Sequence, residues 1–153
     1  MTKEETYAQT QREILAVLDG EPNRTARMAT VACLLAQAFP ANIWTGFYVV
    51  DPDAPGELVV GPYQGTLGCL RIDVGSGVCG AAAASGETQL VADVHAFPGH
   101  IACDARSVSE VVVPVRGPEG ALIAVLDIDN PAAGAFDETD AAALEGLVRA
   151  VFG

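Results

Sequence analysis

The chain has 153 residues, enough for one domain with its own hydrophobic core and too few for a multidomain machine. Half of the residues are apolar and 18% are charged, a composition typical of folded globular proteins and not of disordered chains. The net charge of -12 and the single lysine argue against a phosphate backbone as partner, so we expect no nucleic-acid binding.

The first residues are polar and acidic, whereas a secretory signal would need a basic segment followed by an apolar one. No uninterrupted apolar run approaches the length of a membrane-spanning helix. We therefore expect a cytoplasmic protein with no membrane association. Cytoplasmic thiols are kept reduced, so the four cysteines need an explanation other than a structural disulfide framework.

Two amphipathic helices are predicted at the N-terminus. Apolar residues recur at helical spacing over 3–19 and over 26–38, with Thr25 as the expected N-cap of the second helix and Pro40 beyond its end. The apolar period then changes to two, which predicts strands. These strands are expected at 43–50, 57–60, 68–74, 88–92, 110–116 and 121–128.

Two further helices complete the predicted fold. An Ala-rich helix over 78–85 should end at Gly86 in a left-handed conformation, and a last helix should run from its cap, Asp137, to Val151. Helices at both ends of the chain around a largely antiparallel sheet predict an α+β fold. The expected division is one domain, 1–153, made of N-terminal helices, 1–39, and of the sheet, loops and last helix, 40–153.

The predicted loop over 93–106 is long for so small a domain, which is typical of a functional loop. It contains His95, His100 and Cys103, which could form a zinc site with a further cysteine. Zinc sites usually show C-x2-C or H-E-x-x-H spacings, and neither occurs here. We therefore expect no metal.

Residues 75–80 match the G-x-G-x-x-G pattern of dinucleotide-binding folds, but hairpins follow them where such a fold needs further βαβ units. The alternative is a helix start whose free amide groups hold a carboxylate or stabilise the thiolate of Cys79. Cys69, Cys79 and Cys103 all flank turns or loop ends, and their spacing leaves reactive and buried interpretations open. Cys33 is expected to be a small buried core residue.

Carboxyl groups gather at one end of the predicted sheet. Alternation along the last strand puts Asp127 and Asp129 on one face, and Glu110 begins the neighbouring strand. Buried together, such groups need solvent, a donor such as Arg71, or a bound cation. A solvated strand end that leads into the turn at Asn130 is the alternative.

Aromatic residues on the first strand complete a candidate site. Trp44 and Tyr48 share a face and could wall a pocket, while Phe47 is expected in the core. Amide donors, acids, an aromatic wall and thiols together suit a zwitterionic amino acid.

Six segments of the chain closely resemble the free methionine-(R)-sulfoxide reductases, which are stand-alone GAF domains. The resemblance covers about 40–140 of the chain, and the twelve-residue segment around His95 is the most specific part. The segments are Trp44–Tyr48, Gly61–Gly65, Gly77–Gly80, Asp93–Asp104, Ser109–Glu110 and Asp127–Asp129.

The resemblance implies reduction of free L-methionine (R)-sulfoxide to methionine, with thioredoxin as external reductant and no other cofactor. It makes Cys103 the attacking cysteine, Cys69 the main resolving cysteine and Cys79 a second cysteine able to form a disulfide. The implied cycle passes through a sulfenic acid and an intramolecular disulfide.

The substrate contacts of the family fall on Trp44, Tyr48, Glu110, Asp127 and Asp129. Glu110 or one of the two aspartates would protonate the departing oxygen, and Glu110 and Asp129 are counted among the catalytic residues. The N-terminal helices are expected to serve dimerisation. Two other functions stay open at this point: a GAF domain that senses a small ligand, and a thiol redox sensor without turnover.

Overall fold

Helices and strands follow one another over residues 1–100 and 103–153, which the structure, a computed structural model, describes. Residues 101 and 102, within the predicted loop 93–106, lie outside the described residues. The helices are α1 (Lys3–Val17), α2 (Arg24–Ala38), α3 (Gly77–Ser85) and α4 (Glu138–Phe152), with a 3-10 turn, η1 (Val94–Ala96). The strands are β1 (Trp44–Val50), β2 (Glu57–Gly65), β3 (Arg71–Asp73), β4 (Gln89–Val91), β5 (Ser109–Arg116) and β6 (Leu122–Asn130).

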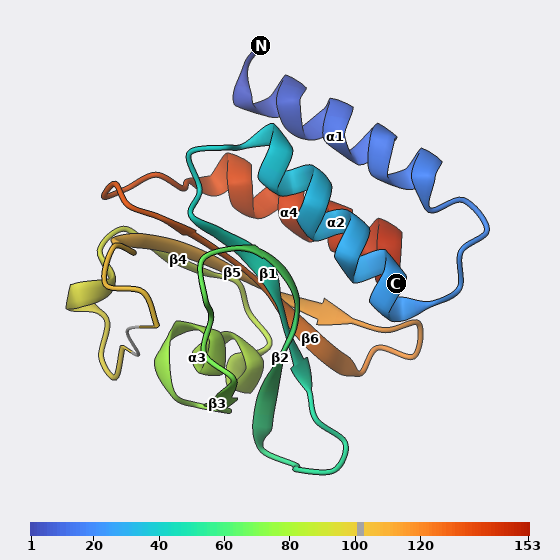
Figure 1. Ribbon diagram of the computed structural model, residues 1–153. Helices are drawn as coiled ribbons and strands as arrows, with labels where there is room; N and C mark the ends of the chain where they lie inside the picture. The colour runs from blue at the N-terminus through green and yellow to red at the C-terminus, as the bar shows by residue number, and fades with distance from the viewer. Residues whose placement is uncertain (101–102) are drawn as a thin grey trace.

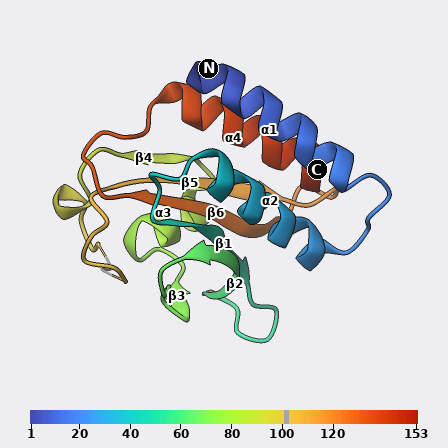
Figure 2. The same cartoon turned by 45° about the horizontal axis from the view of Figure 1, so that its top comes forward.

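The six strands form one sheet in the order β3-β2-β1-β6-β5-β4, and all neighbours in it are antiparallel. Helices α2 and α4 pack on one face of this sheet, and α1 lies across them as an outer layer (Figures 1 and 2). Helix α3 covers part of the opposite face, against β5 and β6. This arrangement is the α+β fold that the sequence predicts.

A hydrophobic core lies on each side of the sheet. Phe47 and Leu126 belong to the larger core, beneath α2 and α4, which confirms the prediction for Phe47. Trp44, Tyr48 and Val125 belong to the smaller core, beneath α3. Because side chains alternate along a strand, β1 and β6 contribute to both cores, and the smaller one is the side on which polar residues gather.

Several predicted boundaries are wrong for local reasons. Asn23, not Thr25, caps α2, since its side chain accepts a hydrogen bond from the Ala26 amide at 2.9 Å. The predicted strand 68–74 is reduced to β3, because the chain first crosses from the end of β2 over the aromatic side chains. Cys33 is partly exposed and is not the buried core residue expected from its apolar neighbours.

The two predicted helix ends are confirmed. Gly86 has a φ of 71° and closes α3, and the side chain of Asp137 caps α4 by accepting from the Thr139 amide at 3.0 Å. Among the described residues, no helix is both long enough and apolar enough to span a membrane.

Candidate active site

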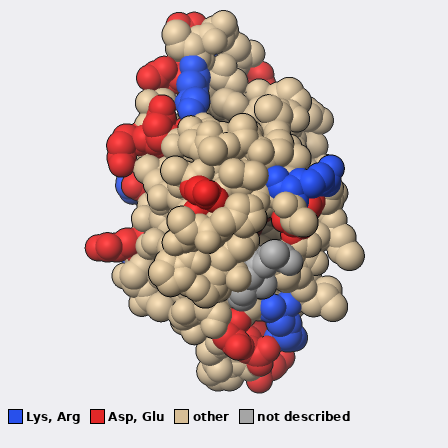
Figure 3. Space-filling view, turned by 90° about the vertical axis from the view of Figure 1, so that its left-hand side faces the viewer, with Lys and Arg blue, Asp and Glu red and all other residues tan. Residues whose placement is uncertain are grey.

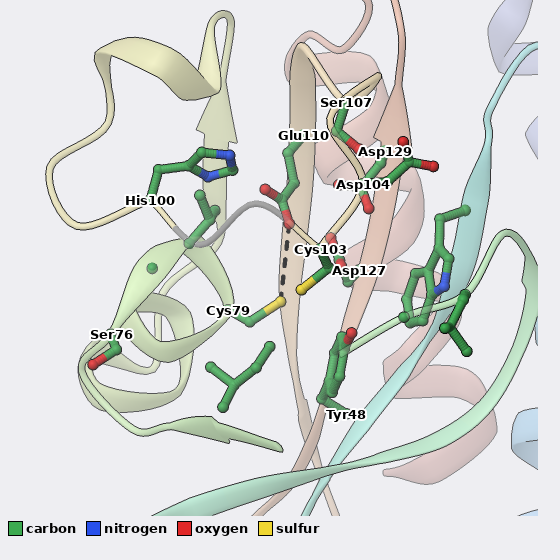
Figure 4. Close-up of a pocket in the computed structure, with 16 residues that line it drawn as sticks. Tyr48, Ser76, Cys79, His100, Cys103, Asp104, Ser107, Glu110, Asp127 and Asp129 are labelled. Carbon is green, nitrogen blue, oxygen red and sulfur yellow. Dashed lines mark hydrogen bonds between the residues drawn. The ribbon is translucent and has the colours of Figure 1, made fainter. Parts of the chain in front are cut away.

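A small cavity of about 40 Å³ lies between α3, the first residues of β1 and β5, the last residues of β6, and the loop after η1 (Figure 4). Seven of the eight predicted site residues line it, and the eighth, Cys69, is bonded to one of the seven. The seven are Trp44, Tyr48, Cys79, Cys103, Glu110, Asp127 and Asp129. Residues more than eighty positions apart therefore meet at one place.

The three carboxyl groups meet because of strand register. Glu110 on β5 lies directly opposite Asp129 on β6, and Asp127 points to the same face two residues earlier. Glu110 and Asp127 are buried, and one oxygen of Asp127, Oδ1, has no hydrogen-bond partner among the described residues. The alternative of a solvated strand end is therefore wrong for Asp127.

Burial sets the protonation of the two aspartates. Desolvation raises the pKa of Asp127 and of Asp129 well above the ordinary range, and repulsion from neighbouring carboxyl groups, Glu110 included, raises each pKa further. Arg71 does not relieve this repulsion, because its guanidinium pairs with Asp51 at 2.7 Å at the outer edge of the sheet. The site thus contains acids that hold a proton at pH values where a free aspartate has lost it.

Cys79 lies in the first turn of α3 and points across the pocket toward Glu110, with Sγ 3.9 Å from Oε2 (Figure 4). Burial raises the pKa of the Cys79 thiol well above its usual value, and the charges of Asp127 and Glu110 raise it further. This burial works against the alternative in which the helix start stabilises a Cys79 thiolate. A helix N-terminus contributes about 1 kcal/mol, which is less than the cost of burying an unpaired charge.

Cys69 and Cys103 form a disulfide, with 5.4 Å between their Cα atoms. It joins the β2–β3 connection to the loop that follows η1. Asp104 supports the same link, since its Oδ2 accepts from Thr66 Oγ1 at 2.7 Å and from Arg106 Nη2 at 2.9 Å. The bond to Arg106 is the main reason why the pKa of Asp104 is well below its usual range.

Aromatic rings form one wall of the cavity. Trp44 stacks on Tyr48 at a centroid distance of 5.3 Å and on Tyr63 at 5.0 Å. The indole Nε1 of Trp44 is buried and has no hydrogen-bond partner among the described residues. Burial also raises the pKa of Tyr48, so that its hydroxyl stays neutral. The wall therefore offers an unused donor to a bound molecule.

Sequence reasoning missed several residues of the cavity, and two of them matter here. Gly68 lies against the aromatic wall, where a Cβ would be 3.0 Å from Tyr48 Oη and 3.0 Å from the Trp44 ring. Ser107 is buried at the opposite end. A lone glycine or serine next to a turn carries no chemical signal of its own, although Gly68 directly precedes Cys69.

Among the described residues, the ligand atoms close enough to hold a metal ion do not include a histidine, although His100 lines the cavity with Cys79 and Cys103. His95 is exposed and does not line the cavity, although its ring lies 6.2 Å from that of His100 between centroids. The ligand atoms that do come together belong to Cys79, Glu110 and Asp127, which lie within 4.8 Å of one another. This set could hold a cation, but it is not the set that the loop spacing suggested.

The chain is similar to known proteins over most of its length. A family model described as GAF domain matches residues 25–151. The free methionine-R-sulfoxide reductase of Escherichia coli is 43% identical over 148 residues, which cover 97% of this chain and 87% of that protein.

Two solved structures are similar over nearly the whole chain. The free methionine-R-sulfoxide reductase of Neisseria meningitidis, in complex with its substrate, has a TM-score of 0.93 and 43% identity, and the match covers 99% of this chain and 89% of that one. The reduced form of the Staphylococcus aureus enzyme of the same name has a TM-score of 0.89 and 39% identity, with 95% and 92% covered.

Proposed function

The chain belongs to the GAF-domain family and, within it, to the free methionine-R-sulfoxide reductases, and on this premise we propose that it reduces free L-methionine (R)-sulfoxide to methionine at the cavity beside α3. The observation that carries the proposal is the position of Cys103. It lies at the cavity, in a disulfide with Cys69, together with buried Asp127 and half-buried Asp129, whose raised pKa values keep a proton available. A thiol and a proton donor are the two groups that sulfoxide reduction needs.

The unused polar atoms of the cavity suit a zwitterionic sulfoxide. The Trp44 indole N–H can donate to an oxygen, and Asp127 Oδ1 can accept from an ammonium group, since neither atom has a protein partner among the described residues. The stacked rings of Trp44 and Tyr48 offer an apolar wall to the side chain. With both ends of the amino acid enclosed, a peptide-bound methionine sulfoxide would be excluded.

The substrate binds the reduced protein in this proposal. The cavity is small in the oxidised protein, about 40 Å³, and the Cys69–Cys103 bond ties together two of the segments that border it. Opening that bond frees the β2–β3 connection, which carries Gly68 over the aromatic wall. Reduction thus precedes binding in each cycle.

Catalysis then follows from the thiols. The Cys103 thiolate attacks the sulfoxide sulfur, a carboxylic acid supplied by Asp127, Asp129 or Glu110 donates a proton to the oxygen, and the oxygen passes to Cys103 as a sulfenic acid while methionine leaves. The Cys69 thiol condenses with the sulfenic acid, which releases water and forms the disulfide. Thioredoxin returns two electrons, since its potential of about -270 mV is low enough to reduce a strained or exposed disulfide.

Cys79 has a smaller part in this cycle than the resemblance implies. Its buried thiol has a raised pKa, and only a thiolate attacks quickly. We therefore propose that Cys69 is the resolving cysteine. Cys79 keeps a neutral thiol and does not attack the sulfenic acid. No metal or organic cofactor takes part in any of these steps.

The test measures methionine and thiols together. The reduced protein is incubated with free L-methionine (R)-sulfoxide and, separately, with the (S) epimer. We expect methionine from the (R) epimer alone, with two thiols lost for each methionine. The Cys103→Ser variant should release none, and Cys69→Ser should release about one per subunit and then stop.

The outcomes separate the enzyme from its alternatives. No methionine from either epimer, with the protein folded and reduced, would favour a GAF domain that senses a ligand. Loss of thiols to peroxide but not to the sulfoxide would favour a redox sensor.

A further inference from the structure

Two large apolar side chains, Leu67 and Leu70, are exposed on either side of Cys69. We propose that, together with Val74, they form a docking surface for the dithiol protein that reduces the Cys69–Cys103 disulfide. This surface is called the leucine patch. The patch consists of Leu67, Leu70 and Val74. The inference rests on the proposed function, because a cycle that closes this disulfide needs an external reductant in every turnover.

The exposure of the patch is unusual for this chain. Leu67 is 78% exposed and Leu70 is 73% exposed, whereas the leucines of the two cores are buried. The other strongly exposed large apolar side chains among the described residues are at the N-terminus and on α1, across the sheet from the disulfide. Exposed apolar groups that gather at a reactive site are typical of an interaction surface and not of chance scatter.

The patch is held in place by its backbone. The Val60 amide donates to the Leu70 carbonyl at 2.9 Å, and the Val74 amide donates to the Gly56 carbonyl at 2.9 Å. On the other side of Cys69, Thr66 donates to Asp104 at 2.7 Å. The apolar side chains therefore project from an ordered segment, and a partner would not have to order that segment on binding.

The basic side chains nearest the patch are paired with acidic ones, in a chain whose net charge is -12. Arg71 pairs with Asp51 at 2.7 Å, and Arg106 pairs with Asp104 at 2.9 Å. Figure 3 shows one face of the molecule, where some basic side chains lie next to acidic ones and other acidic side chains stand alone on an uncharged surface. Glu57 lies 3.7 Å from the Arg71 guanidinium and exposed Asp73 directly precedes Val74, so the surroundings of the patch are acidic and contact with a partner rests on the three apolar side chains.

These features select the kind of reductant. A small dithiol needs only access to sulfur, whereas a protein such as thioredoxin must place its thiolate next to the disulfide and hold it there through surface contact. Cys103 is exposed and Cys69, which the patch flanks, is half-buried, so the patch lies next to a disulfide whose exposed half is Cys103. A thioredoxin-type protein with an apolar surface around its reactive cysteine fits this arrangement.

The dithiol of the reductant supplies the two electrons that reduction of the Cys69–Cys103 disulfide requires. The thiolate of the reductant attacks Cys103 Sγ, an intermolecular S–S bond forms, and the Cys69–Cys103 bond breaks with Cys69 leaving as a thiolate. The second thiolate of the reductant then attacks its own sulfur in the mixed disulfide, and Cys103 leaves. The reductant ends as a disulfide, two electrons have moved to the protein, and two protons from the dithiol are taken up by the two cysteines or by solvent.

The experiment follows reduction of the oxidised protein, which needs no sulfoxide. Leu70→Ser is the test variant, because Leu70 does not line the cavity whereas Leu67 does. Val17→Ser is the matched control, since Val17 is 64% exposed on α1. Thiols are counted while thioredoxin, with its reductase and NADPH, or dithiothreitol alone reduces each protein.

We expect the second-order rate with thioredoxin to fall five- to tenfold in Leu70→Ser and to stay unchanged in Val17→Ser. The rate with dithiothreitol should be the same in all three proteins. Equal thioredoxin rates for Leu70→Ser and the parent would overturn the docking surface, and so would an equal loss with dithiothreitol. Failure of the proposed function appears elsewhere, as absence of methionine from the reduced parent protein with dithiothreitol.

Discussion

Replacing Asp127 by asparagine should stabilise the oxidised protein at pH 7. Asp127 is buried beside Glu110 and Asp129, and its Oδ1 has no hydrogen-bond partner among the described residues. Facing atoms of Asp127 and Glu110 lie within 4.8 Å of each other. Two unit charges at that distance repel by about 3.5 kcal/mol at an effective dielectric constant of about 20.

The raised pKa of Asp127 means that part of this repulsion is avoided by a retained proton. Asparagine is neutral at every pH and can donate to Glu110, so we expect a gain of about 2 kcal/mol in the free energy of unfolding. For a chain of this size the thermal midpoint should rise by about 4–8 °C. Turnover should fall at least a hundredfold if Asp127 is the acid that donates the proton, and less if Glu110 or Asp129 is.

The pH dependence gives the sharper test. In the unfolded chain Asp127 loses its proton near pH 3.9, whereas in the folded protein its raised pKa retains it. The folded state then binds more protons, so stability of the parent falls as pH rises through this interval. The advantage of Asp127→Asn should therefore be small at pH 4 and grow toward pH 7.

Urea denaturation of the oxidised proteins at several pH values measures this difference. Asp73→Asn on β3 is the control, because Asp73 is exposed and its replacement should change stability by less than 0.5 kcal/mol. An Asp127→Asn variant no more stable than the parent at pH 7, or equally stabilised at pH 4, would refute the reasoning.

Two further predictions concern the packing of the fold and of the site. Asp140→Ala should lower the free energy of unfolding, measured by urea denaturation, by about 2–3 kcal/mol. Buried Asp140 accepts hydrogen bonds from Lys3 Nζ at 2.7 Å and from Tyr7 Oη at 2.5 Å. A loss below about 1 kcal/mol would contradict this prediction. Gly68→Ala should raise the KM for the sulfoxide at least tenfold with little change in thermal midpoint, since the added Cβ displaces the Trp44 wall; an unchanged KM would show that this wall does not contact substrate.

The sequence by itself determined much of the local structure. The change of apolar period from helical to two located the strands, and the caps at Gly86 and Asp137 ended and began helices as predicted. The same alternation placed Asp127 and Asp129 on one face. These features depend on neighbours within a few residues, which a linear pattern contains.

Motif similarity supplied what local pattern could not. The spacing of Cys69, Cys79 and Cys103 left reactive and buried thiols equally open, and only the resemblance to a family assigned them roles. The site-residue roles themselves stay predictions, although the structure brings the residues to one cavity.

Tertiary structure alone decided the chemistry of the site. Cys69 and Cys103 are 34 positions apart and meet only when the β2–β3 connection folds across the sheet. From the sequence, Arg71 was a candidate partner for Asp127 and Asp129, but in the folded chain β3 places it beside Asp51. Cys79 lies at a helix start, yet burial raises its pKa. Pairing, burial and charge depend on distance in space, and residues distant in sequence set that distance.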